Sequence, residues 1–299
     1  MAEPDFQMIY LLHNKMHQYL RNAFVIICFL AMVLCCYTPA SCYVLQGPHL
    51  LDLMIKKYGN AKKLLVSQNL IFYDNTRQMD AVKINETLSY VFPEEFRSDI
   101  LSENTQKIHI VSKDRTLTII DGKIADDFKS IFDSYKDLIL YRSRILLQKR
   151  LDMFGVDGSI SSLGRFRGKI AYIVGAQYPD ESAPQVWIDK ETFRPVRWII
   201  TKKAENDRQD TTEFRYVEWK MFDNNWYPIR IEIYQNNTLL REIVVDNINI
   251  TPSFSEDFFN IMKLQSTYME AGQIEQKQRD PEELSEIQKT IEEFKKIYK

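Results

Sequence analysis

Alternation of apolar and polar residues with a period of two runs through most of this 299-residue chain, and it constrains the fold more than any other feature. In segment 83–93, for example, Leu88 and Tyr90 share one face, and Thr87 and Ser89 lie opposite. Such alternation predicts antiparallel strands with one buried face. About ten segments in sequential order predict an α+β fold: an up-and-down antiparallel sheet, curled into an incomplete, half-open β-barrel with covering helices. The segments are 63–74, 83–93, 107–112, 116–121, 168–176, 184–191, 194–202, 211–222, 226–235 and 238–250.

Three segments change to the helical period of 3.6. Residues 50–58 predict a short amphipathic helix that ends at Gly59. An apolar stripe between 125 and 154 predicts one long helix, or two helices in sequence, inserted into the concavity of the sheet. This stripe consists of Phe128, Ile131, Phe132, Tyr135, Leu138, Ile139 and Ile145. A last helix, with acidic residues at its start and lysines at its end, is expected from Pro281 onward, after a polar linker over 265–280.

The N-terminal segment has the layout of a secretory signal peptide. Residues 23–37 carry no charge, follow Lys15 and Arg21, and precede the small residues Ala40 and Ser41. A membrane-spanning helix needs about 20 apolar residues, so a retained single-span anchor is the weaker interpretation. We therefore expect a signal peptide over 1–42, a lipid-binding half-barrel over 43–264, and a linker with a C-terminal helix over 265–299.

All four cysteines lie in that first segment. Cys35 and Cys36 are adjacent rather than spaced as zinc ligands, and no histidine cluster lies near them. Cys42 differs, because 39–42 resembles a bacterial lipoprotein box with proline in the place of leucine. Two outcomes stay open: simple cleavage after Ala40 or Cys42, which gives a periplasmic protein of a Gram-negative-type bacterium, or a membrane anchor through a lipid on Cys42. We favour simple cleavage.

The remaining chain offers little chemistry. A net charge of −2 favours neither nucleic acid nor an anionic membrane surface. Only His49 and His109 follow the signal, which argues against a metal site, and His109 is expected to be solvated. The serines at 159–162 lack the nucleophile-elbow pattern, and the nearby glycines make no dinucleotide motif. We expect a binding module that is not an enzyme and needs no cofactor; a hydrolase ranks last.

A curled sheet of this size can enclose an apolar cavity. The strand residues expected to line it are Leu88, Tyr90, Phe92, Ile108, Ile110, Leu117, Ile119 and Trp198. The helix residues expected to cover them are Phe132, Tyr135 and Leu138.

Five segments, in this order, resemble the LolA/LolB-like family of periplasmic lipoprotein carriers. They are VSQNLIFYD (66–74), YVFPEEFRSDIL (90–101), LTIIDGKI (117–124), VWIDKETFRPVRWII (186–200) and NITPSFSEDFF (249–259). The resemblance covers most of 50–259 and implies a half-barrel whose concave face accepts acyl chains. The chain departs from the family at Phe92, where the lipoprotein carrier has an arginine that helps to hold its lid closed, and in the additional tail over 265–299.

These observations predict an exported, monomeric carrier or binder of lipid acyl chains or lipoproteins. The alternative is an envelope sensor or protein-interaction module that joins an envelope partner through the C-terminal helix. Deletion of 281–299 separates the two: loss of partner binding with lipid binding intact favours the second hypothesis, and loss of lipid binding favours the first.

Overall fold

The computed structural model describes residues 16, 18–29, 44–73, 82–102, 105–113, 115–125, 130–203 and 209–276, with side chains as far as Tyr268. The chain divides into two units, Met1–Tyr43 and Val44–Lys299. In the first unit, residues 18–29 are helical and expose Phe24, Ile27 and Phe29. No helix within the described ranges has the length and apolar character of a membrane span. Most of the predicted signal segment, Cys42 included, lies outside the described residues.

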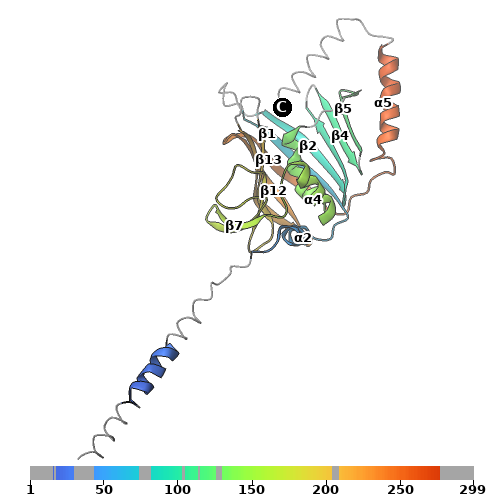
Figure 1. Cartoon of the computed structure of the whole chain (residues 1–299). Helices are drawn as coiled ribbons and strands as arrows, with labels where there is room; N and C mark the ends of the chain where they lie inside the picture. Colours follow the sequence, from blue (N-terminus) through green and yellow to red (C-terminus); the bar gives the residue numbers. More distant parts are fainter. Residues whose placement is uncertain are drawn as a thin grey trace, which may run out of the picture. The chain divides into compact units, whose positions relative to one another are not determined.

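The second unit is built on one antiparallel sheet of 13 strands (Figure 1). The strands are β1 (Lys63–Phe72), β2 (Val82–Val91), β3 (Glu95–Leu101), β4 (Gln106–Ser112), β5 (Arg115–Ile120), β6 (Lys123–Ile124), β7 (Ser161–Phe166), β8 (Lys169–Val174), β9 (Gln185–Asp189), β10 (Pro195–Lys203), β11 (Gln209–Phe222), β12 (Asn225–Gln235) and β13 (Thr238–Asn249). The ten predicted strands are all present. The three that the sequence did not predict are β3, β6 and β7, and a buried serine in β3, Ser98, hides the alternation there.

The strand order is β6-β5-β4-β3-β2-β1-β13-β12-β11-β10-β9-β8-β7. Strands that follow one another in the sequence are neighbours, as expected, except β6 and β7, and β1 also pairs with β13. The edges of the sheet are therefore β6 and β7, in the middle of the chain. This order confirms a curled, open antiparallel sheet in an α+β fold.

Helices occupy the gap in the sequence between β6 and β7. They are η1, a 3-10 helix over Ile131–Lys136, α3 (Asp137–Leu140) and α4 (Arg144–Met153), which we call the helical insert. Of the two alternatives, several short helices rather than one long one are present, with a non-helical link over 141–143. Ile145 was wrongly placed on the buried stripe, since the helix restarts at Arg144 and leaves Ile145 69% exposed.

The main core lies between the insert and the concave face of the sheet. Side chains of β1, β2, β8–β13 and the insert form one buried cluster. Helix α2 (Gly47–Lys57) joins it through Leu50, Leu51 and Met54 and packs against α4. As predicted, this helix ends before Gly59, whose φ of +96° is a conformation that suits glycine.

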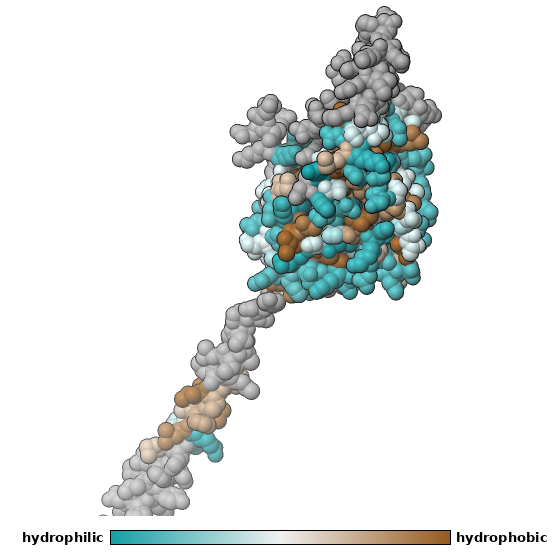
Figure 2. All heavy atoms as spheres, turned by 90° about the vertical axis from the view of Figure 1, so that its right-hand side faces the viewer, coloured by the Kyte–Doolittle hydropathy of each residue, from teal (hydrophilic) through white to brown (hydrophobic). Residues whose placement is uncertain are grey.

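The opposite face of β4 and β5 is covered by α5 (Ile261–Gln276), which packs on β5 and β6 (Figure 1). Ile261 is buried there, and Leu264 and Tyr268 are partly buried against the sheet. The predicted linker over 265–280 is thus helical as far as Gln276, because Ile261, Leu264 and Tyr268 fall on one helical face. The surface on the α5 side is mixed, with separate apolar side chains among hydrophilic ones (Figure 2). The predicted helix from Pro281 lies outside the described residues.

Candidate ligand cavity between the helical insert and the sheet

Alternate residues of β4 face opposite layers, and this decides which side chains meet the insert. Lys107 points to η1, since its Nζ lies 3.1 Å from Oδ2 of Asp133. His109 and Val111 share that face. Ile108 and Ile110 point the other way and pack in the cluster under α5.

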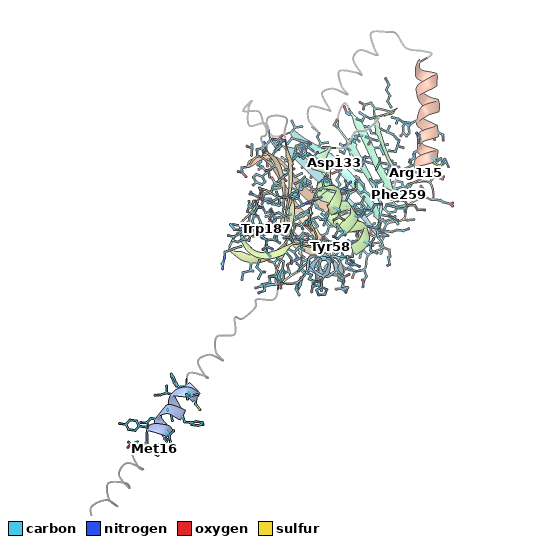
Figure 3. The ribbon with its side chains drawn as sticks, viewed as in Figure 1. Met16, Tyr58, Arg115, Asp133, Trp187 and Phe259 are labelled. Carbon is cyan, nitrogen blue, oxygen red and sulfur yellow. The ribbon has the colours of Figure 1, made fainter. Side chains whose placement is uncertain are left out.

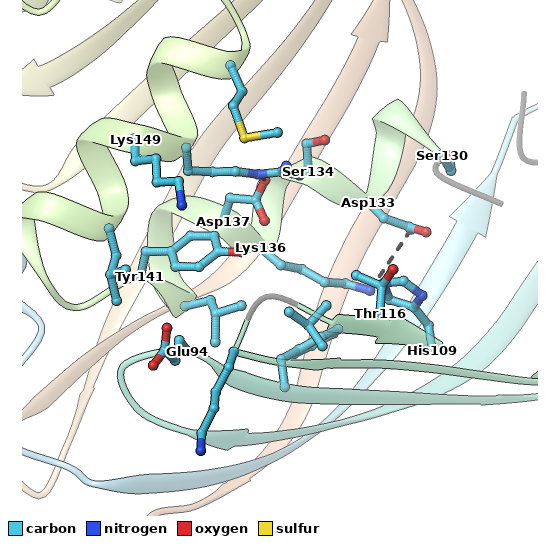
Figure 4. Close-up of a pocket in the computed structure, with 17 residues that line it drawn as sticks. Glu94, His109, Thr116, Ser130, Asp133, Ser134, Lys136, Asp137, Tyr141 and Lys149 are labelled. Atoms are coloured by element: carbon cyan, nitrogen blue, oxygen red, sulfur yellow. Dashed lines mark hydrogen bonds and ion pairs between the residues drawn. The ribbon is translucent and has the colours of Figure 1, made fainter. Parts of the chain in front are cut away.

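A cavity of about 320 Å³ lies between the insert and the ends of β3, β4 and β5 (Figure 4). Its apolar lining comes from both layers: Phe96 and Val111 from the sheet, and Leu140, Leu146 and Met153 from the insert. The polar lining residues are Glu94, His109, Lys113, Thr116, Ser130, Asp133, Ser134, Lys136, Asp137, Tyr141, Lys149 and Arg150. A lining that combines apolar side chains from both layers with polar and charged ones suits an amphiphilic ligand.

A buried polar network fixes η1 to the sheet beside this cavity. The carboxylate of Glu86 accepts hydrogen bonds from Nζ of Lys136 at 2.6 Å, Oγ of Ser98 at 2.5 Å and Nε2 of Gln68 at 2.6 Å. Buried charges need such partners, since a buried charge that loses its partner costs about 3–5 kcal/mol. The network therefore holds the N-terminal half of the insert in place.

Two carboxyl groups at the cavity have shifted pKa values. Burial raises the pKa of Asp137 to about 6, although the guanidinium of Arg150 lies 2.6 Å away and opposes the shift. Burial also disfavours the charged form of Asp133, but the ammonium groups of Lys107 and Lys136 outweigh it and hold that pKa well below its usual range. Burial lowers the pKa of Lys107 itself.

An aromatic row leads from the cavity to the link of the insert. Phe96 packs against Tyr90 at 5.3 Å between ring centroids, and Tyr90 stacks on Phe92 at 5.5 Å. The guanidinium carbon of Arg142 lies 3.5 Å from the centroid of the Phe92 ring. In this contact the strand supplies the ring and the insert supplies the guanidinium.

The predicted cavity residues divide into two groups. Seven belong to or pack against the main core under the insert: Leu88, Tyr90, Phe92, Phe132, Tyr135, Leu138 and Trp198. Ile108, Ile110, Leu117 and Ile119 lie instead on the other face, under α5. Figure 3 shows this α5 side at Arg115 and Phe259, away from Trp187. Alternation groups residues by face, but it does not say which of two buried faces is the concave one.

None of the predicted cavity residues lines the described cavity. His109, expected to be solvated, is partly buried there, and its Nδ1 lies 2.8 Å from Oγ1 of Thr118. Its burial could have been predicted from the alternation, because His109 shares a face of the strand with Val111, opposite Ile108 and Ile110. Within the described ranges, no group of three or more His, Cys, Asp or Glu side chains could hold a metal ion.

An open antiparallel sheet that curls around a helical insert defines the class of fold, and solved structures share it. A domain described as an outer membrane lipoprotein-sorting protein, from Vibrio parahaemolyticus, aligns with a TM-score of 0.50 at 10% identity, over 73% of this chain and 97% of that chain. A DUF1329 family protein from Desulfovibrio piger aligns with a TM-score of 0.50 at 13% identity, over the same shares. A LolA superfamily protein from Nitrosomonas europaea aligns with a TM-score of 0.44 at 9% identity, over 72% and 98%.

The chain therefore has a LolA-like fold, as the sequence resemblance predicted. At these identities the likeness concerns the fold alone. No protein-family model and no curated protein matches the sequence.

Proposed function

We propose that this protein is an exported carrier or binder of lipid acyl chains or lipoproteins, and that it acts by reversible burial of a chain in the apolar interior of the half-barrel. The observation that carries the proposal is the cavity of about 320 Å³ between the insert and the sheet, with apolar walls from both layers. Each buried CH₂ group contributes about 0.8 kcal/mol, so one acyl chain gives useful affinity without covalent chemistry.

The position of the insert supports reversible opening. Its residues are not part of the sheet, and they follow β6 and precede β7, the two unpaired edges. A shift of α4, which takes no part in the hydrogen bonds of Glu86, would therefore enlarge the cavity without breaking a strand pair. Under the proposal, the buried residues Leu88, Tyr90, Leu138 and Trp198 would then contact the longer part of the chain.

The interaction-module alternative, which relies on the helix expected from Pro281, ranks second. That helix lies outside the described residues, and Ile261, Leu264 and Tyr268 of α5 pack on the chain's own sheet. Envelope location remains part of the proposal. It is supported by the apolar segment 23–37, which is followed by small residues, and by the absence of cysteine after Cys42.

Two adjacent residues of α4 provide the test. Leu146 lines the cavity, whereas Ile145 does not line it and is 69% exposed. Leu146→Trp places a larger ring in the cavity. We expect it to weaken binding of a fluorescent fatty acid at least about tenfold, because the ring excludes about two CH₂ groups of the acyl chain from the cavity. Ile145→Trp adds the same ring outside and should leave the affinity within about twofold of the parent.

Native mass spectrometry of the protein purified from an envelope fraction gives a second readout. We expect co-purified lipid with the parent and with Ile145→Trp, and less with Leu146→Trp. A lipid-free mass, together with no binding of the fluorescent fatty acid, would contradict the proposed function. Equal binding by both tryptophan variants would show that the chain does not enter this cavity.

A further inference from the structure

Arg142 is a partly buried residue, and within the described part of the chain no acidic side chain forms an ion pair with its guanidinium. It lies in the link between α3 and α4, and its Nε and Nη2 are enclosed and make no hydrogen bond. Its Nη1 donates one long hydrogen bond, of 3.4 Å, to the carbonyl oxygen of Ala61. The nearest compensation comes from the faces of two rings, Phe92 at 3.5 Å and Tyr58 at 5.6 Å.

Three tyrosines, Tyr58, Tyr90 and Tyr227, act electrostatically on this cation. The Tyr58 hydroxyl is buried and has no hydrogen-bond partner. The hydroxyls of Tyr90 and Tyr227 lie 3.1 Å from each other and within electrostatic reach of Arg142. Burial raises the pKa of all three phenols, so they are neutral donors. Burial also lowers the pKa of Arg142 to about 10, which still leaves the guanidinium charged at neutral pH.

The buried carboxylate that acts on two of these tyrosines is already engaged. Glu86 acts electrostatically on Tyr90 and Tyr227, but its oxygens accept hydrogen bonds from Lys136, Ser98 and Gln68. A guanidinium with two free donors, beside phenol groups that can also donate, is the complement of a carboxylate or phosphate. An enclosed guanidinium without a charged partner is costly, so we look for that partner outside the described part of the chain.

We propose that Arg142, with the hydroxyls of Tyr58, Tyr90 and Tyr227, receives the acidic head group of a single-chain amphiphile, such as a free fatty acid. The inference rests on the proposed function and makes it more specific. The acyl chains of a lipoprotein are esters or amides and have no free acid, so this site selects a different ligand. The row Phe92–Tyr90–Phe96 connects the head-group site to the cavity. Because the two donors are enclosed, the link over 141–143 must shift to admit the head group.

The test compares ligands with the same chain and different heads. Dodecanoate and its methyl ester each displace the neutral probe N-phenyl-1-naphthylamine from the parent protein, and acetate serves as the chainless anion. A hydrogen bond to a charged group contributes about 1.5–3 kcal/mol, so we expect dodecanoate to bind at least about tenfold more tightly than the ester. Acetate should not displace the probe, and displacement by acetate would show a site for small anions instead.

Variants assign the preference to Arg142. Arg142→Met keeps the length of the side chain and removes the charge, so it should abolish the preference for the acid and leave the affinity for the ester within about threefold. Arg144→Met, an exposed position two residues away, is the matched control and should keep the preference. Tyr58→Phe removes only an unpartnered hydroxyl, and it should reduce the preference several-fold even if Arg142→Met fails to fold.

The outcomes are distinguishable. Equal binding of acid and ester by the parent, or a preference that survives both Arg142→Met and Tyr58→Phe, would show that Arg142 has only a structural role and overturn the inference, with the proposed function intact. Failure of both chain-bearing ligands to bind would overturn the proposed function, and the inference with it.

Discussion

At the scale of single residues, the two carboxyl groups of η1 and α3 show how local charge decides between opposite effects of burial. Asp133 faces two ammonium groups, and its carboxylate is stabilised. Asp137 faces one guanidinium, and burial outweighs that partner, so its pKa rises from 3.8 to about 6. A carboxyl group whose pKa is higher in the folded state binds more protons there than in the unfolded state. Its contribution to stability is therefore present at low pH and is lost as the pH rises through about 4 to 6.

Asp137→Asn should remove this pH dependence. The amide resembles the protonated acid in shape and has no charge, so the parent should lose stability relative to the variant as the pH rises from 4 to 7. The expected change is on the order of 2 kcal/mol, from a pKa shift of roughly two units. Urea unfolding of both proteins at pH 4, 5, 6 and 7 measures it. If the parent gains stability relative to the variant over this range, the ion pair with Arg150 outweighs burial.

At the scale of elements, β4 and β5 show how far the sequence can predict the candidate site. Alternation correctly groups Ile108 with Ile110, and Leu117 with Ile119, because neighbouring strands carry them in register. It does not identify the layer that they face, since both sides of these strands are covered. The insert packs on the face that carries His109, and α5 packs on the face that carries Ile110. Only the spatial positions of the helices decide between the two sides.

A pair of adjacent α5 residues tests whether this helix is a structural cover. Ile261 is 7% exposed against the sheet, whereas Met262 is 66% exposed. Ile261→Asp buries a charge without a partner and should lower the free energy of unfolding by about 2–4 kcal/mol, whereas Met262→Asp should change it by less than about 0.5 kcal/mol. Chemical denaturation measures both. The folded variants should bind the fluorescent fatty acid equally well, and a loss of binding in Ile261→Asp alone would place the ligand under α5 instead.

At the scale of the whole molecule, the sequence predicted an open antiparallel sheet, but it did not predict that the first strand pairs with the last. Ten alternating segments suffice to predict a curled antiparallel sheet, since turns join sequential strands. The pairing of β1 with β13 joins residues such as Leu70 and Ile243, and no local pattern encodes a contact over that distance. This pairing moves the free edges to β6 and β7. It therefore brings the insert, and with it Arg142, to the open side of the half-barrel.

The division of the chain at Tyr43 leads to a prediction about the mature protein. The sheet and the insert both belong to Val44–Lys299, and the chain enters that unit at α2, where Gly47 packs closely against the carbonyl oxygen of Gly158. Cleavage after Ala40 or Cys42 would thus leave the sheet and the insert complete. We expect the intact mass of protein released by osmotic shock from a Gram-negative host to correspond to one of these starts, without diacylglycerol. A Cys42→Ala variant should fractionate like the parent. A membrane-bound parent with an added diacylglycerol mass, released by Cys42→Ala, would instead show an anchored lipoprotein.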